Sequence, residues 1–367
     1  MIKVLMLVPD LNNGGVGEVA KNIILALSDK IQFDIITNNK LTIETEKEIS
    51  GDYNKIFVIK RLKDSGILKY SREIKKIMKS NQYDAIHINT DLLAWITAKL
   101  AKDCNIKIRI GNAHGQFFAH YSKLLIKLIT PICQALNRYY CTDKIGCSKE
   151  SIKHMFNTEG NLIPNFVCDK KIEILDRERK MLLRKEFGIE NHNVVIGYSG
   201  HLDGTKNAIF LIEILNAIND ENVFLVLAGA TNIYDKFQSE IQKYGLSNNV
   251  KLLGHRTDMK IIYNIFDVYM TASKSEGMSM SIIQSQMMGI PCVVSNGVPD
   301  NNDLGCDLFF KCGSYEADEW KNKFNQALEA SDKIDLEEIA AKIKKSNNGA
   351  EYAISELFKI YSRNSAS

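Results

Sequence analysis

Short apolar runs alternate with longer segments of helical periodicity along the whole chain. The runs are rich in Val, Ile and Leu, which predicts strands buried in parallel sheets between covering helices. A first series of predicted strands comprises Lys3–Val8, Phe33–Ile36, Lys55–Ile59, Ala85–Ile88, Lys107–Asn112, Lys144–Cys147 and Leu162–Ile163. A second series comprises Val194–Tyr198, Val223–Ala228, Val250–Leu253, Val268–Thr271 and Cys292–Val294. This rhythm predicts an α/β protein with two parallel sheets.

A charged segment with few apolar residues, 169–185, separates the two series. We interpret most of it as the first helix of a second domain, with the linker at 166–171. The last predicted helix, Leu336–Tyr361, is interrupted at Asn347-Asn348-Gly349. The predicted organisation is a first domain at 1–168, a second at 169–346 and a terminal helix at 347–367, which suits a chain of 367 residues.

Composition narrows the class of protein. The net charge of +3 does not indicate a nucleic-acid partner, and no apolar run approaches the ~18–20 residues that span a bilayer. The eight cysteines form no C-x-x-C pair, so we expect reduced thiols in a cytoplasmic protein rather than a zinc or redox site. No D-x-D pattern indicates a bound metal, and we expect no cofactor.

The stretch 275–295, SEGMSMSIIQSQMMGIPCVVS, is the most informative of the sequence. It predicts a loop with Glu276 and Gly277 after one strand, then a helix from Ser281 to Met288 and a further strand. Such loops lie at the edge where parallel sheets bind ligands. Backbone N–H groups at the helix start can hold a phosphate; they belong to Met278, Ser279 and Met280. The alternative is an ordinary surface loop with a solvated glutamate.

Two further loops follow predicted strands. Gly14 and Gly15 precede a helix predicted at Val19–Leu27 and allow close approach of an anion. The literal G-x-G-x-x-A match there starts too long after its strand for a dinucleotide site, and a glycine loop without ligand is the alternative. The second loop runs from Gly200 through His201 to Lys206, whose ammonium group suits a diphosphate. A solvated surface lysine is the alternative.

Two histidines lie at predicted strand ends. His114 closes the run Arg109–Gly115, and His87 precedes Asn89 at the end of another strand. A lone histidine at a strand end has either a structural or a functional role, and the spacing does not separate the two.

The Glu276-Gly277 stretch resembles the donor-site motif of retaining GT-B glycosyltransferases of family 4. In that family a second Glu stands eight residues after the first, and Gln284 occupies its place here. The resemblance extends over nearly the whole chain and to its exopolysaccharide and capsule branch. It implies two Rossmann-like domains facing an interdomain cleft, with an acceptor on the N-terminal domain and a nucleotide sugar on the C-terminal domain. It also implies transfer with retention and without a metal.

The resemblance assigns roles to the candidate residues. Glu276, His114 and Lys206 become the catalytic candidates, with Glu276 on donor-sugar hydroxyls and His114 beside the sugar. The implied donor site also contains Gly14, Gly15, Gly200, His201 in place of the family's Arg, Gly277, Met278, Ser279, Met280 and Gln284. His87 and Asn89 are acceptor-side candidates. Gln284 either binds the nucleotide ribose or forms a capping box with Ser281.

The resulting expectation is a glycosyltransferase that moves a sugar from a UDP-sugar to a lipid-linked oligosaccharide in capsule, O-antigen or exopolysaccharide synthesis. A nucleotide-sugar epimerase and a non-catalytic sugar-nucleotide-binding or scaffold protein are the rivals. Basic amphipathic segments at 67–82 and 121–140 predict peripheral binding to the inner face of the plasma membrane. The alternative is that both segments are ordinary domain helices with solvated basic faces.

Overall fold

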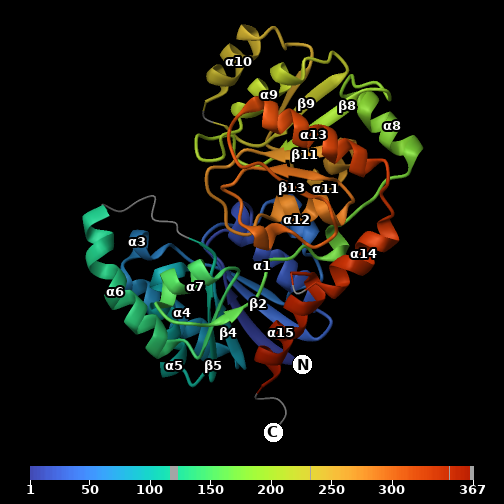
Figure 1. Ribbon diagram of the computed structural model, residues 1–367. Helices are drawn as coiled ribbons and strands as arrows, with labels where there is room; N and C mark the ends of the chain where they lie inside the picture. Colours follow the sequence, from blue (N-terminus) through green and yellow to red (C-terminus); the bar gives the residue numbers. More distant parts are fainter. Residues whose placement is uncertain (116–122, 232, 347, 364–367) are drawn as a thin grey trace. The chain divides into compact units, whose positions relative to one another are not determined.

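The computed structural model describes residues 1–115, 123–231, 233–346 and 348–363, with the backbone alone at 123–127. The chain divides into two compact units (Figure 1). The N-terminal unit comprises Met1–Cys168 and the chain from Ala350 onward, and the C-terminal unit comprises Asp169–Gly349.

The described part of the N-terminal unit forms a parallel sheet in the order β3-β2-β1-β4-β5-β6-β7. Its strands are β1 (Ile2–Leu7), β2 (Ile31–Thr37), β3 (Lys55–Val58), β4 (Ala85–Ile88), β5 (Ile108–Ala113), β6 (Asp143–Gly146) and β7 (Asn161–Leu162). Its helices are α1 (Gly14–Leu27), α2 (Ile43–Glu48), α3 (Leu62–Ser65), α4 (Ile67–Ser80), α5 (Ala94–Asp103), α6 (Lys123–Tyr140), α7 (Lys149–Phe156) and α15 (Ala350–Ser362), with a 3-10 turn η1 at Asp91–Leu93.

The C-terminal unit has a parallel sheet in the order β10-β9-β8-β11-β12-β13. Its strands are β8 (Val194–Ser199), β9 (Val223–Ala228), β10 (Val250–Gly254), β11 (Val268–Thr271), β12 (Cys292–Val294) and β13 (Phe309–Lys311). Its helices are α8 (Arg177–Glu186), α9 (Phe210–Ile218), α10 (Tyr234–Lys243), α11 (Met259–Ile262), α12 (Met280–Met287), α13 (Ala317–Ser331) and α14 (Leu336–Lys345); 3-10 turns are η2 (Asp169–Lys171), η3 (Tyr263–Ile265) and η4 (Asp300–Asn302). Both sheets thus have the 3-2-1-4-5-6 strand order of Rossmann-like domains.

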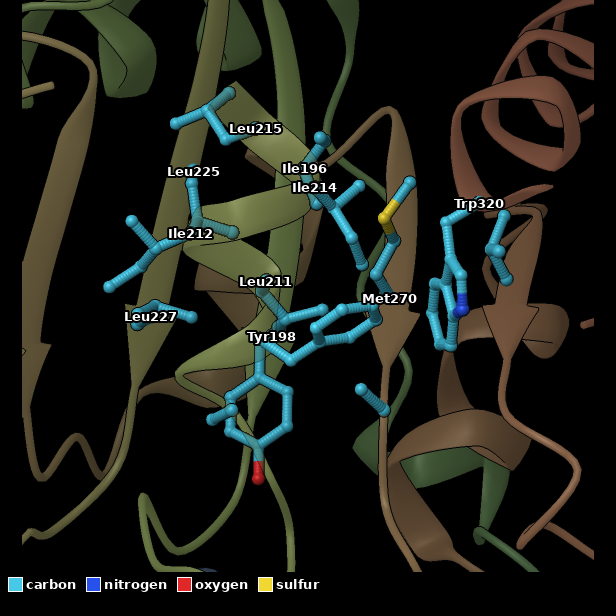
Figure 2. Close-up of a cluster of buried hydrophobic side chains, with 14 of the residues drawn as sticks. Ile196, Tyr198, Leu211, Ile212, Ile214, Leu215, Leu225, Leu227, Met270 and Trp320 are labelled. Carbon is cyan, nitrogen blue, oxygen red and sulfur yellow. The ribbon is translucent and has the colours of Figure 1, made fainter. Parts of the chain in front are cut away.

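Alternate side chains of the C-terminal strands enter two separate cores, because successive residues of a strand point to opposite faces of the sheet. On β8, Ile196 and Tyr198 pack under α9 and α13, whereas Val195 packs on the other face with α12. Figure 2 shows the first core, in which Trp320 of α13 closes one side. Tyr198 lies at its edge with the hydroxyl turned away from the aliphatic side chains.

The N-terminal sheet is covered in the same way. Side chains from α4, α5 and α7 form one buried cluster with the strands. Helix α15 contacts α1 and β1, so the last helix of the chain belongs to the N-terminal sheet.

The pattern predicts the two sheets correctly, with strand ends within about two residues, but two local expectations are wrong. Strand β13 is missing from the prediction because its three residues are only half-buried and lack an alternating pattern. Helix α1 begins at Gly14 instead of Val19, so the predicted glycine loop is the first turn of the helix. The expectation that most of the charged segment 169–185 is helical is confirmed, because α8 covers it from Arg177 onward, after the 3-10 turn η2 and the irregular stretch 172–176.

Candidate functional site

The loops that follow β8 and β11 meet at the carboxyl edge of the C-terminal sheet. These strands are neighbours at the point where the strand order changes direction. In open α/β sheets this switch point is where ligands bind, because the loops on either side leave room between them. The fold therefore brings together the loop 200–206 and the loop 272–279. Lys206 and Glu276, one in each loop, are 70 residues apart in sequence.

The loop after β8 is held by its own polar groups. The Tyr198 hydroxyl donates to the carbonyl of His201 at 2.9 Å. The Asp203 carboxylate accepts from the backbone N–H groups of Thr205 and Lys206, each at 2.9 Å. Gly200 has φ +146°, a backbone conformation that L side chains rarely adopt. His201 itself is exposed.

The structure joins two predicted site residues directly. Lys206 Nζ donates to both carboxylate oxygens of Glu276 at 2.7 Å. The side chains are 29% and 11% exposed, so solvent reaches the pair without surrounding it. An ammonium and a carboxylate in this setting can exchange partners: the first suits a phosphate, and the second suits a sugar hydroxyl.

The loop that carries Glu276 rests on a glycine. The N–H of Glu276 donates to the carbonyl of Gly297 at 3.0 Å. A Cβ atom on Gly297 would lie 2.4 Å from the carbonyl oxygen of Ser273. Only glycine lets the two segments approach this closely, so Gly297 determines the position of the Glu276 loop.

Asn302 fixes the next part of the same loop. Its Oδ1 accepts from the N–H of Ser279 at 2.6 Å, and its Nδ2 donates to the carbonyl of Gly277 at 2.9 Å. The expectation of a free N–H at Ser279 is therefore wrong. Met280 is the first residue of α12, where backbone N–H groups have no acceptor within the helix.

The capping-box interpretation of Gln284 is also wrong. The residue that caps α12 is Ser279, and it caps without a side-chain hydrogen bond. The Ser281 hydroxyl instead donates to the carbonyl of Ser199 on β8 at 3.2 Å. Gln284 is half-buried on α12, and its contact with a ribose stays a prediction.

In the N-terminal unit, a chain of hydrogen bonds joins both predicted histidines. His114 Nε2 lies 2.7 Å from Asn89 Oδ1. Asn112 Nδ2 lies 3.2 Å from the same oxygen and 3.0 Å from His87 Nε2. His87 Nδ1 lies 2.5 Å from the hydroxyl of Tyr361 on α15. We call these five residues the His114 relay.

Burial keeps the relay histidines neutral. Desolvation lowers the pKa of His87 to about 3, with a smaller contribution from the neighbouring His114. Desolvation also lowers the pKa of His114 to about 4. Nearby, burial raises the pKa of Asp91 to about 6, against the effect of a hydrogen bond from the His114 backbone N–H.

The acceptor-side expectation for His87 and Asn89 needs correction. Their side chains are buried, and His87 is 0% exposed. They support His114, which is half-buried, and do not themselves reach the surface. Gly14 and Gly15, in the first turn of α1, have open space around their Cα atoms, and Gly14 has φ +83°. Their contact with a ligand stays a prediction.

Sequence reasoning misses four residues that hold the candidate site together: Asp203, Asn302, Asn112 and Tyr361. Asp203 has a local signal, because an Asp two residues before a turn commonly accepts backbone N–H groups. The other three act through contacts with residues more than 20 positions away, and no sequence spacing announces them.

The two predicted membrane segments differ in the structure. In α4, Tyr70, Ile74 and Met78 face the core, as in an ordinary domain helix, and the exposed apolar residues are Ile67 and Leu68 at its start. In α6, Leu128 and Ile132 are 65% and 62% exposed; the segment 121–127 lies outside the described side chains. Among the helices that the structure describes, none has the length and apolar character of a membrane span.

Known proteins resemble this chain in sequence and structure. Residues 180–347 match the profile of the family described as Glycosyl transferases group 1. The chain is 25% identical over 300 residues to the UDP-Gal:alpha-D-GlcNAc-diphosphoundecaprenol alpha-1,3-galactosyltransferase of Escherichia coli, covering 74% of this chain and 76% of that protein. It is 21% identical over 325 residues to the capsular polysaccharide biosynthesis glycosyltransferase CapH of Staphylococcus aureus, covering 86% of both. The crystal structure of Anabaena HepE in complex with UDP-glucose matches with a TM-score of 0.79 at 17% identity, over 100% of both chains.

Proposed function

We propose that this chain, which has the GT-B fold, is a group 1 glycosyltransferase and transfers a sugar from a UDP-sugar to a lipid-linked oligosaccharide of a surface polysaccharide. The observation that carries the proposal is the Lys206–Glu276 pair at the switch point of the C-terminal sheet. The pair places a cation and a carboxylate side by side, which are the two groups that a diphosphate and its sugar require.

The donor would bind to the C-terminal unit through complementary charges. Lys206 supplies a positive charge to the diphosphate, and the start of α12 near Met280 supplies backbone N–H groups. Both favour the leaving diphosphate more strongly as negative charge develops on it. Glu276 would accept hydrogen bonds from sugar hydroxyls. Gln284, one turn further along α12, would contact the ribose.

We propose transfer with retention of the anomeric configuration and without a metal ion. Lys206 and the helix start offer the diphosphate positive electrostatic potential from the chain itself. Retention follows from the resemblance of the Glu276-Gly277 stretch to family 4.

The acceptor would bind to the N-terminal unit, with His114 positioning a sugar hydroxyl. The relative from Escherichia coli is named for a diphosphoundecaprenol-linked acceptor, which supports a lipid-linked acceptor here. Exposed Leu128 and Ile132 on α6 would enter the lipid interface. The proposed location is therefore the cytoplasmic face of the plasma membrane.

A transfer assay with purified protein tests this proposal. Radiolabelled UDP-sugars are offered with and without undecaprenyl-diphosphate-linked saccharides, and products are followed by extraction and by NMR of the new anomeric centre. We expect acceptor-dependent transfer that Glu276→Ala abolishes. Glu221→Ala is the matched control, because Glu221 is an exposed glutamate of the same unit and should leave transfer unchanged.

The other outcomes separate the rivals. Isomerisation of a UDP-sugar without acceptor would identify an epimerase. UDP-sugar binding without turnover on any acceptor would identify a binding or scaffold protein. Sedimentation with anionic vesicles at low and high salt tests the membrane proposal, since basic interfacial helices bind anionic lipid less tightly at high salt.

A further inference from the structure

We propose that Asn89 is a positioning residue for His114 and, within the His114 relay, fixes its imidazole with the proton on Nε2 and the lone pair on Nδ1. The tautomer follows from the hydrogen bonds alone. Its use in catalysis deepens the proposed function and rests on it.

The relay has a fixed direction because it starts at a backbone carbonyl. Asn89 Nδ2 donates to the carbonyl oxygen of Leu7 at 3.1 Å. A carbonyl oxygen can only accept, so the NH₂ group of Asn89 must face Leu7 and its Oδ1 must face the relay. This oxygen can only accept as well, and both groups in contact with it must therefore donate.

The first group that donates to Asn89 is Asn112. Its Nδ2 contacts Asn89 Oδ1 and also His87 Nε2. An NH₂ group has two protons and no acceptor lone pair, so it donates to both. His87 Nε2 therefore carries no proton.

The proton of His87 must then lie on Nδ1. A fully buried histidine whose pKa is lowered to about 3 is neutral at pH 7 and has one N–H. That N–H points at the Tyr361 hydroxyl, which accepts the bond at 2.5 Å. Only the His87 tautomer with its proton on Nδ1 suits Asn112. The Tyr361 hydroxyl provides that proton with an acceptor.

The second group that donates to Asn89 is His114. Its Nε2–H occupies the Asn89 oxygen at 2.7 Å, so the Nδ1 of this neutral ring carries the lone pair. Such a nitrogen accepts a hydrogen bond from a hydroxyl group. The expected ligand atom at His114 is therefore a sugar hydroxyl that donates, and an anionic oxygen is disfavoured there.

Tyr361 is held rigidly as the acceptor of the His87 proton. It is 0% exposed and meets the ring of Phe33 edge-on at 6.3 Å between centroids. Two residues later, Arg363 makes a two-pronged ion pair with Asp143 of β6, at 2.8 and 2.9 Å. Helix α15 (Figure 1) thus has two polar anchors on the N-terminal sheet, and only the Tyr361 anchor belongs to the relay.

The test uses nitrogen-15 NMR of the histidine rings in the full-length protein, with the His114 signal assigned by its loss in His114→Gln. The wild type should show an Nε2–H ring at His114 and an Nδ1–H ring at His87. Asn89→Leu keeps a side chain of similar size but removes the oxygen that accepts from His114, so His114 should show mixed tautomers. Tyr361→Phe removes only the acceptor of His87, so His87 should show mixed tautomers while His114 keeps its proton on Nε2. Arg363→Gln is the matched control, because it weakens the other anchor of α15 and should leave both tautomers unchanged.

Kinetics supply the second measurement. Asn89→Leu should lower kcat about fivefold to tenfold, the rate equivalent of one hydrogen bond, with KM for the UDP-sugar unchanged. Arg363→Gln should lower it less than twofold.

An Nδ1–H ring at His114 in the wild type, or an unchanged His114 tautomer in Asn89→Leu, would overturn the proposal. Equal tautomer changes in Arg363→Gln would reduce Tyr361 to an anchor of the helix. If the protein transfers no sugar, the proposed function fails, and the NMR result still decides the relay.

Discussion

The Lys206–Glu276 pair makes a counterintuitive prediction about UDP. In the structure the Glu276 carboxylate accepts hydrogen bonds from the Lys206 ammonium group, which the diphosphate would use. Glu276→Ala removes a negative charge from beside the diphosphate and leaves Lys206 free for it. We therefore expect Glu276→Ala to lose sugar transfer and yet to bind UDP more tightly than the wild type.

The magnitude follows from the charges. A unit charge about 5 Å away contributes about 1–3 kcal/mol at an effective dielectric constant of ~20–80. The side chains are only 29% and 11% exposed, so screening is incomplete and the gain should be at least about 1 kcal/mol, or fivefold in UDP affinity. Glu276→Gln should show much of the same gain, because it removes the charge and keeps the shape. Lys206→Ala should instead weaken UDP binding by about 1.5–3 kcal/mol, the value of a charge-assisted hydrogen bond.

Isothermal calorimetry with UDP and with the UDP-sugar, at low and high salt, measures these effects. The gain should shrink at high salt, and it should be smaller for the UDP-sugar, whose hydroxyls lose their bonds to Glu276. Glu221→Ala again controls for net charge. Unchanged or weaker UDP binding by Glu276→Ala would refute the shared-cation arrangement.

Three further predictions concern the loops and the relay. Gln284→Ala should weaken UDP binding by about 1 kcal/mol at an unchanged melting temperature, and Gln284→Glu should preserve or improve binding; a lower melting temperature with unchanged affinity would place Gln284 outside the donor site. Gly297→Ala should destabilise the fold by about 1–3 kcal/mol, because its Cβ would lie 2.4 Å from a backbone oxygen, whereas Gly313→Ala, with its nearest neighbour at 3.6 Å, should be near neutral in urea unfolding. The two relay histidines have pKa values lowered to about 3 and about 4, so their contribution to stability is complete above pH 6.5 and is lost as the pH falls toward 4. Asp91, whose pKa is raised to about 6, binds a proton in the folded protein below pH 6 and so offsets one of the two histidines. The combined contribution of the three groups to the free energy of unfolding should therefore fall by about 1.4 kcal/mol for each pH unit below 6. Urea unfolding at pH 7, 6 and 5 measures this, and stability that rises toward pH 5 would contradict it.

The sequence by itself determines the two sheets and the loops that carry the candidate residues. A strand buried on both faces needs a nearly continuous apolar run, and such a run is visible without a structure. Loops at the ends of these strands then collect Glu276, Lys206 and His114 by position alone. Strand β13 is not predicted because its residues are half-buried. The start of α1 is not predicted because Gly14 and Gly15 are poor helix formers.

Only the tertiary structure decides which of these residues touch. The strand order places β8 beside β11, and this neighbourhood turns Lys206 and Glu276 from two separate loop residues into one ion pair. Asn302 and Tyr361 owe their roles to the same kind of contact: the first lies 23 residues after Ser279, and the second lies 274 residues after His87. A polar side chain carries no local pattern that reveals a distant partner, because its hydrogen bond depends on packing that brings the two together. The pattern of apolar residues determines the two sheets, and the packing of the chain around these sheets determines which polar side chains make contact.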